Sequence, residues 1–348
     1  MSERIYDTII NSEPITKGWS GDKKYCVITT DDMKYLLRIF PVSRYESRNM
    51  LFELMEQAEA LDVPMCTPIE CGICDEGVYW LQSWIDGEDL EAVLHTFSEA
   101  EQYVYGVKAG EILRKIHSVP ALGVPSERPD WAVSFDHSTY ERIEKYHSCG
   151  LRFDGDEPVL EFLTQNKSLI ENRPQNLQHG DYSIRNMMLE KGELKIIDFE
   201  RLYFGDPWED FVFNMLEAAK NSYFTTGQFH GYFGGEPSEE FWRTYAFYIY
   251  SSLLPGMYEL DQTDTFEKDR ILKQTAEILR WFESIGNPVP TWYLKGYEVC
   301  DVLDTDGNKT RRFHERGKPM NEGKHHLEVH VGMVSELNRS CVERNSNL

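Results

Sequence analysis

The sequence predicts an α+β fold built of two lobes, a small β-rich N-terminal lobe and a large helical C-terminal lobe. Three observations support this prediction. Residues 1–85 alternate short apolar runs with Gly, Ser and Asp turns, which is typical of strands joined by hairpins. Beyond residue 88, apolar residues recur at the spacing of amphipathic helices. Residues 177–207 interrupt this helical part with a short hairpin that carries several carboxylates.

The N-terminal lobe opens with a turn that contains Gly18, Ser20 and Gly21 and leads into the apolar run YCVITT. Small residues in such a turn let backbone N–H groups approach phosphate oxygens. A second run, KYLLRIF, follows the turn, and we expect both runs to be strands. The segment after Pro41 has apolar residues at helical spacing, so it is predicted to be a helix that packs on the sheet.

The boundary between the lobes is expected at the break Asp86-Gly87. Two predicted strands flank a turn before it, and the second of them, VYWLQSW, leads directly to the break. The chain is thereby divided into residues 1–85, residues 86–295 and a tail of residues 296–348.

The C-terminal lobe is expected to begin with a long helix. Ser98 followed by Glu101 is a capping box, and the helix it starts runs toward Pro120. A proline-rich loop is predicted at residues 121–136. Further helices are predicted within 138–172, with an interruption, and at 208–222, 239–257 and 266–285.

The hairpin region carries the residues with the clearest chemistry. Asp181 can accept a proton, Asn186 offers a neutral oxygen, and Asp198 offers an anionic one at the end of an apolar run. A turn at residues 190–193 brings Asn186 and Asp198 to the same end, and oxygen donors of this kind suit Mg²⁺. Glu200 would point to the same side as Asp198 and contact a second metal ion. This order and spacing is that of a kinase catalytic loop followed by its metal-binding aspartate.

The motifs HGDYSIRNMML and IIDFERLYFGDPWEDF resemble those of the aminoglycoside phosphotransferase family, the antibiotic kinases that share the protein-kinase fold. The resemblance extends over about residues 10–294 and implies a bilobal protein-kinase-like fold without a long activation segment. It implies that Asp181 is the catalytic base and that Asn186 and Asp198 are magnesium ligands. It also implies a structural role for Asp206 and Asp210 in DPWED.

The same resemblance assigns the nucleotide site. The turn at residues 18–21 would cover the phosphates, and a cation on the following strand would grip them. Arg38 holds that position, with Lys34 as the alternative, and Glu53 is expected to pair with the cation, with Glu56 as the alternative. The donor is ATP or GTP. Backbone groups at the hinge are expected to bind the purine edge, namely those of Gln82, Ser83, Trp84 and Ile85.

Composition limits the partners of the chain. Its formal net charge of −23 argues against binding to nucleic acid and to anionic membrane surfaces, and favours a cationic small-molecule substrate. Solubility is the alternative reason for such a charge, and the charge by itself does not decide between the two. The antibiotic kinases use their C-terminal helices as a wall of the acceptor site, which offers Glu209 and Asp210 as contacts for such a substrate. There is no signal peptide and no long apolar run, so we expect a cytoplasmic protein. The seven cysteines are expected to be reduced.

The tail at residues 296–348 differs from the rest of the chain. It resembles the opening of a Nudix hydrolase of the isopentenyl-diphosphate-isomerase-like kind, and it stops before any Nudix box, so no hydrolase activity is expected. The run HHLEVHV alternates apolar and polar residues. We expect it either to lack fixed structure or to pair with another strand edge, including that of a second chain in a weak dimer.

The predicted function is therefore that of a small-molecule kinase that transfers the γ-phosphate of ATP or GTP to a hydroxyl of an aminoglycoside-like acceptor. Choline, homoserine, methylthioribose and sugars are alternative acceptors, because the resemblance covers kinases of these metabolites too. The alternative from a different class is a non-catalytic nucleotide-binding pseudokinase. The intact set of Asp181, Asn186 and Asp198 argues against it.

Overall fold

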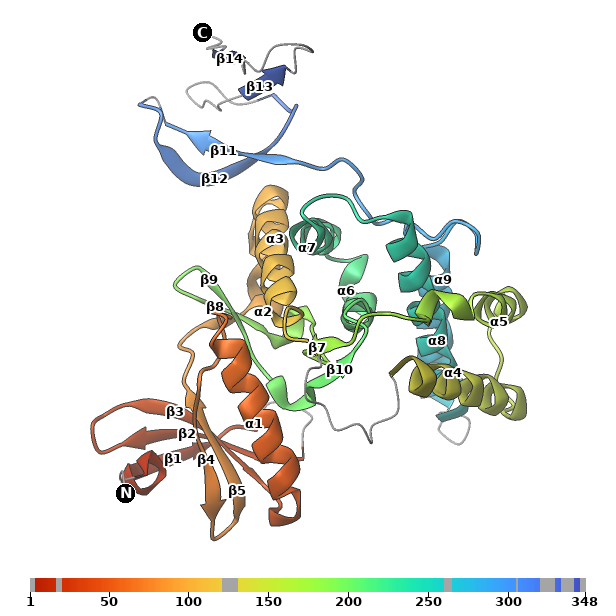
Figure 1. Ribbon diagram of the computed structural model, residues 1–348. Helices are drawn as coiled ribbons and strands as arrows, with labels where there is room; N and C mark the ends of the chain where they lie inside the picture. Colours follow the sequence, from red (N-terminus) through yellow and green to blue (C-terminus); the bar gives the residue numbers. More distant parts are fainter. Residues whose placement is uncertain are drawn as a thin grey trace.

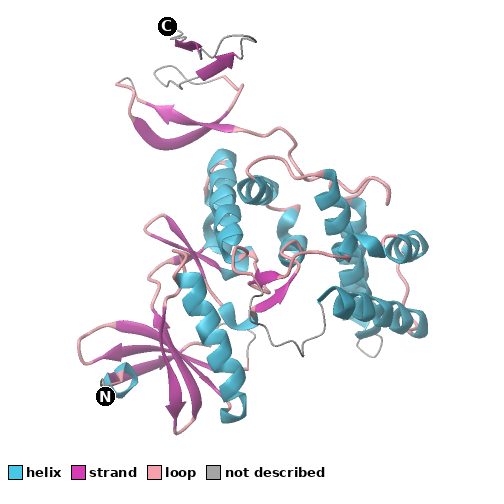
Figure 2. Cartoon of the chain, viewed as in Figure 1, coloured by secondary structure: helices cyan, strands magenta, loops and turns pink. Residues whose placement is uncertain are grey.

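The computed structural model describes residues 4–16, 21–120, 131–259, 265–304, 306–319, 329–332 and 341–344. Gly18 and Ser20 of the predicted phosphate-covering turn lie outside the described residues, as does most of the run HHLEVHV. The molecule has two lobes, as predicted. Figure 2 shows a large sheet in the N-terminal lobe and most of the helices in the C-terminal lobe.

The N-terminal lobe is one antiparallel sheet with the strand order β1-β2-β3-β5-β4. The predicted helix, α1 (Tyr45–Glu59), packs beside the sheet against β4 and β5 (Figure 1). There Phe52 faces the buried indole of Trp80, with ring centroids 6.1 Å apart. The strands are β1 (Ile9–Pro14), β2 (Lys23–Thr29), β3 (Lys34–Phe40), β4 (Pro68–Cys74) and β5 (Gly77–Ser83).

The C-terminal lobe is helical, and two small sheets lie where it meets the N-terminal lobe (Figure 1). One sheet has the order β6-β8-β9, and the other pairs β7 with β10. These strands are β6 (Glu88–Asp89), β7 (Asn176–Gln178), β8 (Met187–Glu190), β9 (Glu193–Ile196) and β10 (Tyr203–Gly205). The α-helices are α2 (Leu90–Val93), α3 (Glu99–Ile116), α4 (Trp131–Ser148), α5 (Asp156–Gln165), α6 (Met215–Ala218), α7 (Ser222–Phe233), α8 (Glu239–Glu259) and α9 (Thr265–Arg280).

Helix α3 begins where its capping box predicts. The Ser98 hydroxyl accepts the backbone N–H of Glu101, and the Glu101 carboxylate accepts the backbone N–H of Ser98. The loop predicted at residues 121–136 is wrong over residues 131–136, because α4 begins at Trp131, and the rest of it lies outside the described residues. The side chains of Trp131 and Phe135 are buried, and their ring centroids lie 5.0 Å apart. This packing stabilises a helix in a segment where the sequence predicts a loop.

Helix α7 was not predicted, because its apolar residues show no helical stripe. Helix α7 packs directly against α3, and its own side chains are buried on several faces of the helix. The close approach depends on glycine. A Cβ on Gly110 would lie 2.0 Å from the carbonyl oxygen of Gln228, and one on Gly231 would lie 2.0 Å from that of Val107. Helices can approach this closely only where side chains are absent.

Two hairpins form the described part of the tail, β11 (Val299–Leu303) with β12 (Lys309–Glu315), and β13 (Val329–Gly332) with β14 (Cys341–Arg344). The segment leading into β11 rests on the helical lobe, where the ring of Tyr297 lies 5.0 Å from that of Tyr103 on α3. Among the described helices, none combines the length and the apolar character that a bilayer crossing requires.

Candidate active site

The hairpin β8–β9 brings the two predicted metal ligands to one end, as the sequence predicts. Met187 pairs with Ile196, and just beyond this pair the backbone N–H of Ile197 donates to the carbonyl of Asn186 at 3.0 Å. Asn186 precedes β8, and Asp198 follows β9 by two residues. Both line the same cavity between the lobes.

Hydrogen bonds to Asp210 hold the backbone of the loop that carries Asp181. The buried carboxylate of Asp210 accepts the backbone N–H groups of His179 at 2.7 Å and of Gly180 at 2.9 Å. It also bonds Nε2 of His117 at 3.0 Å. Both of its oxygens are therefore occupied within the protein. This supports the structural role of Asp210 and removes it from the candidate contacts for a cationic acceptor.

His179 links the catalytic loop to the strand before Asp198. Its Nε2 bonds the carbonyl of Ile197 at 3.0 Å, and its Nδ1 accepts the backbone N–H of Asp181 at 3.3 Å. Complete burial lowers the pKa of His179, which keeps the ring neutral with its proton on Nε2. Gly180 has a φ of +78°, and a Cβ there would lie 2.2 Å from the carbonyl oxygen of Arg201, so the turn requires glycine.

The side chains of Asp181 and Asn186 are oriented for different tasks. Nδ2 of Asn186 donates to the main-chain carbonyl of Asp181 at 2.9 Å, so the amide oxygen of Asn186 is left to accept from another group or to bind a cation. The carboxylate of Asp181 has no hydrogen-bond or ion-pair partner among the described residues. It is available to a bound acceptor.

Arg38 stands at the centre of a buried ion-pair cluster. Its side chain is 3% exposed, and it donates to Asp22 through Nε at 2.6 Å, to Asp198 through Nη1 at 2.7 Å and to Glu200 through Nη2 at 2.7 Å. Although burial opposes ionisation of Asp198, the charge of Arg38 outweighs it and lowers the pKa of that carboxyl. The backbone of Asp198 is left-handed, with a φ of 68°.

The predicted ion pair between Arg38 and Glu53 is wrong. Glu53 lies on the exposed face of α1, where its carboxylate accepts from Nδ2 of Asn49 at 2.8 Å, and Glu56 is exposed as well. The residue of α1 that lies next to the ion-pair cluster of Arg38 is instead a cation, Arg48. Nη1 of Arg48 lies 3.9 Å from Oε2 of Glu200, and its guanidinium covers the Phe40 ring at 4.2 Å. The sequence interpretation missed both Arg48 and Asp22.

A cavity of about 330 Å³ lies between the lobes and ends at this cluster. Its far wall contains Ser83, Trp84 and Ile85, and Trp84 and Ile85 have no backbone hydrogen-bond partner among the described residues.

The inclusion of Gln82 in the hinge is wrong. Gln82 is buried within β5, paired on both sides by β3 and β4, and its side chain donates to Sγ of Cys66 at 3.3 Å. The other described lining residues are Ile15, Lys24, Leu36, Arg38, Cys66, Asp86, Gly87, Asp89, Arg185, Asn186, Met188, Ile197 and Asp198.

The donor set at the end of this cavity fits a magnesium ion. Mg²⁺ is commonly held by one or two protein oxygen ligands together with phosphate oxygens and water. The free amide oxygen of Asn186 and the carboxylate of Asp198 supply these two. The described residues contain no cluster of three or more His, Cys, Asp or Glu side chains arranged to hold a metal by themselves. The site therefore suits an ion that arrives with a phosphate group.

Glu209 is the one candidate acceptor contact of DPWED that keeps some exposure. Its Oε2 accepts from Nε1 of Trp131 at 3.2 Å and from the hydroxyl of Tyr203 at 3.0 Å. Burial raises the pKa of Glu209 to about 7, and the nearby charge of Asp210 acts in the same direction. Tyr203 pairs with Gln178, which directly precedes the catalytic loop, so Glu209 is tied to the strand that leads to Asp181.

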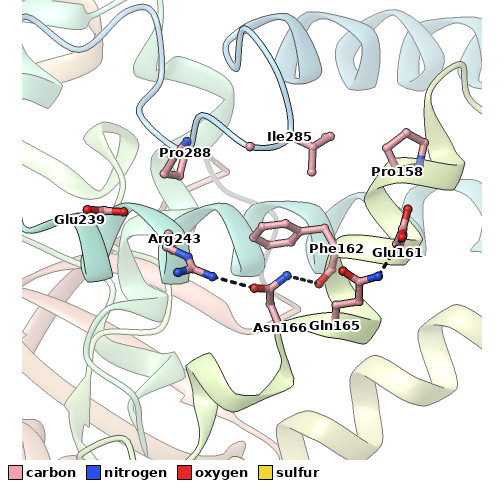
Figure 3. A pocket seen from close by; sticks show the side chains of 10 residues that line it. Pro158, Glu161, Phe162, Gln165, Asn166, Glu239, Arg243, Ile285 and Pro288 are labelled. Carbon is pink, nitrogen blue, oxygen red and sulfur yellow. Dashed lines mark hydrogen bonds between the residues drawn. The ribbon is translucent and has the colours of Figure 1, made fainter.

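A second large cavity, of about 490 Å³, lies elsewhere in the C-terminal lobe, between α5, α8 and the segment after α9 (Figure 3). Its polar side chains are bonded to one another. Arg243 donates to Asn166 at 2.9 Å, and Gln165 donates to Glu161 at 2.8 Å. None of its lining residues belongs to the segment 177–207, so the catalytic-loop chemistry has no access to it.

Comparison with known proteins gives one family and one fold. A family model described as a phosphotransferase enzyme family matches residues 12–245. None of the curated protein sequences matches the chain. The family match ends at residue 245, and the Nudix resemblance of the tail stays a prediction.

Solved structures with the same fold include three kinases. The chain is similar to an amicoumacin kinase in complex with AMP-PNP, Ca²⁺ and Ami, at 14% identity over 76% of this chain and 87% of that one, with a TM-score of 0.53. It is similar to a GDP complex of an aminoglycoside 2'-phosphotransferase of type IIIa, at 15% identity over 78% and 91%, with a TM-score of 0.54. It is also similar to a choline/ethanolamine kinase family protein from Mesorhizobium loti, at 16% identity over 80% and 90%, with a TM-score of 0.54.

Proposed function

Because the chain belongs to the phosphotransferase enzyme family, we propose that it transfers the γ-phosphate of ATP or GTP to a hydroxyl of a cationic, aminoglycoside-like small molecule. The observation that carries this proposal is that Asn186 and Asp198 line one end of the interlobe cavity, where Asn186 also bonds the main-chain carbonyl of Asp181. The other end of the cavity has the open backbone groups of Trp84 and Ile85. A donor nucleotide would place its base at the end with the open backbone groups and its phosphates at the end with Asn186 and Asp198.

In the mechanism that we propose, Asp181 orients the acceptor hydroxyl and takes its proton as the oxygen attacks the γ-phosphorus. The products are the phosphorylated acceptor and the nucleoside diphosphate. Asp181 suits this role because its carboxylate has no partner among the described residues, while Asp210 and His179 fix the backbone beneath it. A base held in this way loses little freedom when it meets the acceptor.

Asn186 and Asp198 would hold Mg²⁺, and when bound the ion neutralises the charge of the donor phosphates. Arg38 contributes a fixed positive charge beside them, and Glu200 holds Arg38 in place, because its Oε2 accepts from Nη2 of Arg38. Contact of Glu200 with a second metal ion stays a prediction. Gly21 is the one described residue of the predicted phosphate-covering turn. The space around Gly21 is open, because a Cβ added there would have no atom within 4 Å.

The choice of a cationic acceptor rests on the net charge of −23 and on the partly exposed Glu209 next to the catalytic loop. One structural neighbour is an aminoglycoside phosphotransferase, which agrees with this choice. Another belongs to the choline/ethanolamine kinase family, so a cationic metabolite such as choline is the alternative acceptor. Homoserine, methylthioribose and sugars complete the set of metabolites to be tested.

The proposal is tested by coupled detection of ADP or GDP release in the presence of Mg²⁺. ATP and GTP are each combined with kanamycin, gentamicin, neomycin, choline, homoserine and methylthioribose. Saturable release with an aminoglycoside supports the proposed acceptor class, whereas release with a metabolite alone replaces it. Nucleotide binding without release for any acceptor would favour a non-catalytic pseudokinase over the enzyme.

A further inference from the structure

Beside the interlobe cavity lies another one, of about 350 Å³, between the end of β3, the start of α1 and the 3-10 helix η6 (Phe199–Arg201). Three arginines line it, Arg44, Arg48 and Arg201. The remaining lining residues are Gly21, Asp22, Phe40, Pro41 and Glu200. A group of three cations in one cavity stands out in a chain whose net charge is −23.

The two acids in this cavity are bonded mainly to Arg38, although Oε2 of Glu200 also lies 3.9 Å from Nη1 of Arg48. Asp22 and Glu200 each form a hydrogen-bonded ion pair with the guanidinium of Arg38, at 2.6 and 2.7 Å. Arg44 and Arg201 are exposed, and neither has an ion-pair partner among the described residues. Two full positive charges therefore face the cavity without a counterion from the part of the protein that the structure describes.

Arg48 forms the buried floor of the cavity. The residue is 8% exposed and is held between the Phe40 ring at 4.2 Å and the Trp80 ring at 5.5 Å. Its Nε is buried and has no hydrogen-bond partner among the residues that the structure describes. Burial lowers the pKa of Arg48, and the like charges of Arg38 and Arg44 add to the effect. A buried donor without a partner costs free energy that a bound acceptor would recover.

The backbone adds to the same preference. The cavity adjoins the N-terminal end of α1, a helix of 15 residues whose N-cap residue, Arg44, makes no side-chain capping bond. The N-terminal end of a helix favours a bound anion. Guanidinium groups present paired N–H donors that match the oxygens of a phosphate group.

We propose that this arginine cavity, lined by Arg44, Arg48 and Arg201, is a binding site for a phosphate-type oxyanion, separate from the nucleotide cavity. Asp22 and Glu200 line it and also bond Arg38, which in turn bonds Asp198, so the cavity is linked to Asp198 through Arg38. The volume accommodates a small phosphate monoester as well as inorganic phosphate. The site does not depend on the acceptor proposed above.

The test is equilibrium dialysis of the full-length protein against radiolabelled inorganic phosphate, without nucleotide, with glycerol 3-phosphate as a second probe. The double variant Arg44→Gln/Arg201→Gln should weaken phosphate binding by about tenfold or more, because two charge-assisted contacts are lost. Both side chains are exposed, so the variant should fold. Equal affinity for the two probes means that the oxyanion alone is recognised, and tighter binding of the monoester means that the cavity also holds its organic part. Both results support the site.

Two control variants locate the bound phosphate. Lys24→Gln removes a cation that lines the nucleotide cavity, and Arg280→Gln removes an exposed arginine at the end of α9. Neither should change phosphate binding. Loss of binding in Lys24→Gln with retention in the double variant would place the phosphate in the nucleotide cavity and overturn the proposal. Absence of binding by both probes to the unaltered protein would overturn it as well.

Discussion

Nη1 of Arg38 donates to Oδ1 of Asp198 across 2.7 Å, so the cation expected to grip phosphate is paired with the carboxylate expected to bind the metal. The same guanidinium holds Asp22 and Glu200. One buried positive charge thus compensates three carboxylates that come from two lobes. Arg38 therefore links residues of the N-terminal lobe to residues of the C-terminal lobe.

We therefore expect Arg38→Met to destabilise the protein by about 3 kcal/mol or more, because three partly buried carboxylates lose their counterion. Added Mg²⁺ should restore part of the loss in the variant and have a smaller effect on the parent protein, since the freed carboxylates can bind it. Urea denaturation with and without Mg²⁺ measures both effects. The matched control is Arg4→Met in the same lobe, whose exposed pair with Asp7 should contribute little to stability. Equal losses in the two variants would contradict the central role of Arg38.

The second prediction concerns Asp181. Asp181→Ala should lower kcat by roughly 10²- to 10⁴-fold, the usual contribution of a general base, and leave nucleotide affinity nearly unchanged. Turnover is measured with the acceptor found in the release assay, and nucleotide affinity by calorimetry. The control is Asp154→Ala, an exposed aspartate before α5. Turnover in Asp181→Ala within a factor of a few of the parent would exclude Asp181 as the base.

Local signals explain which parts of the site could be predicted. Asn186 and Asp198 flank one hairpin, and Asp181 lies in the loop just before it, so sequence spacing alone brings the two predicted metal ligands together. The partner of Arg38 could not be derived in this way. The resemblance to the antibiotic kinases implied Glu53 as the partner, yet the face of α1 directed at the cluster carries Arg48. The carboxylates come instead from Asp22 and Glu200.

In the fold, too, the features set by local sequence could be predicted, whereas those set by tertiary packing could not. The capping box at Ser98 and the hairpin strands follow from local rules, and both are present. Helix α7 is buried on several sides, so it lacks the amphipathic stripe by which a surface helix is recognised. Its only sequence signal is the pair Gly227 and Gly231, four residues apart, which matches the pair Gly106 and Gly110 on α3. That match becomes informative only once the two helices are known to be neighbours.

The third prediction is a pH dependence that comes from Glu209. Burial raises its pKa in the folded protein from 4.5 to about 7, so the folded state binds the proton more tightly than the unfolded state. The contribution to stability is present at low pH and is lost as the pH rises from about 4.5 to 7. Asp210 raises the pKa, and the hydrogen bonds from Tyr203 and Trp131 and the charge of Arg142 lower it.

Glu209→Gln mimics the protonated acid, so this variant should lose that pH dependence. It should be more stable than the parent at pH 8 by roughly 2 to 3 kcal/mol and similar to it at pH 4. Urea denaturation at the two pH values measures the difference, and Glu91→Gln, at an exposed position, serves as the control. A constant difference between Glu209→Gln and the parent at both pH values would contradict a titrating Glu209.

The fourth prediction tests the packing of α3 against α7. Gly110→Ala should destabilise the protein by about 2 kcal/mol or more, although alanine is the better helix former by about 1 kcal/mol. The added Cβ would lie 2.0 Å from the carbonyl oxygen of Gln228, and backbone cannot move aside as a side chain can. The matched control is Gly256→Ala in α8, where the Cβ would meet only Cγ2 of Ile271 at 3.1 Å. Here the helix propensity of alanine should dominate, so stability should hold or rise. Urea denaturation of both variants decides, and a stabilising Gly110→Ala would show that the two helices can separate without cost.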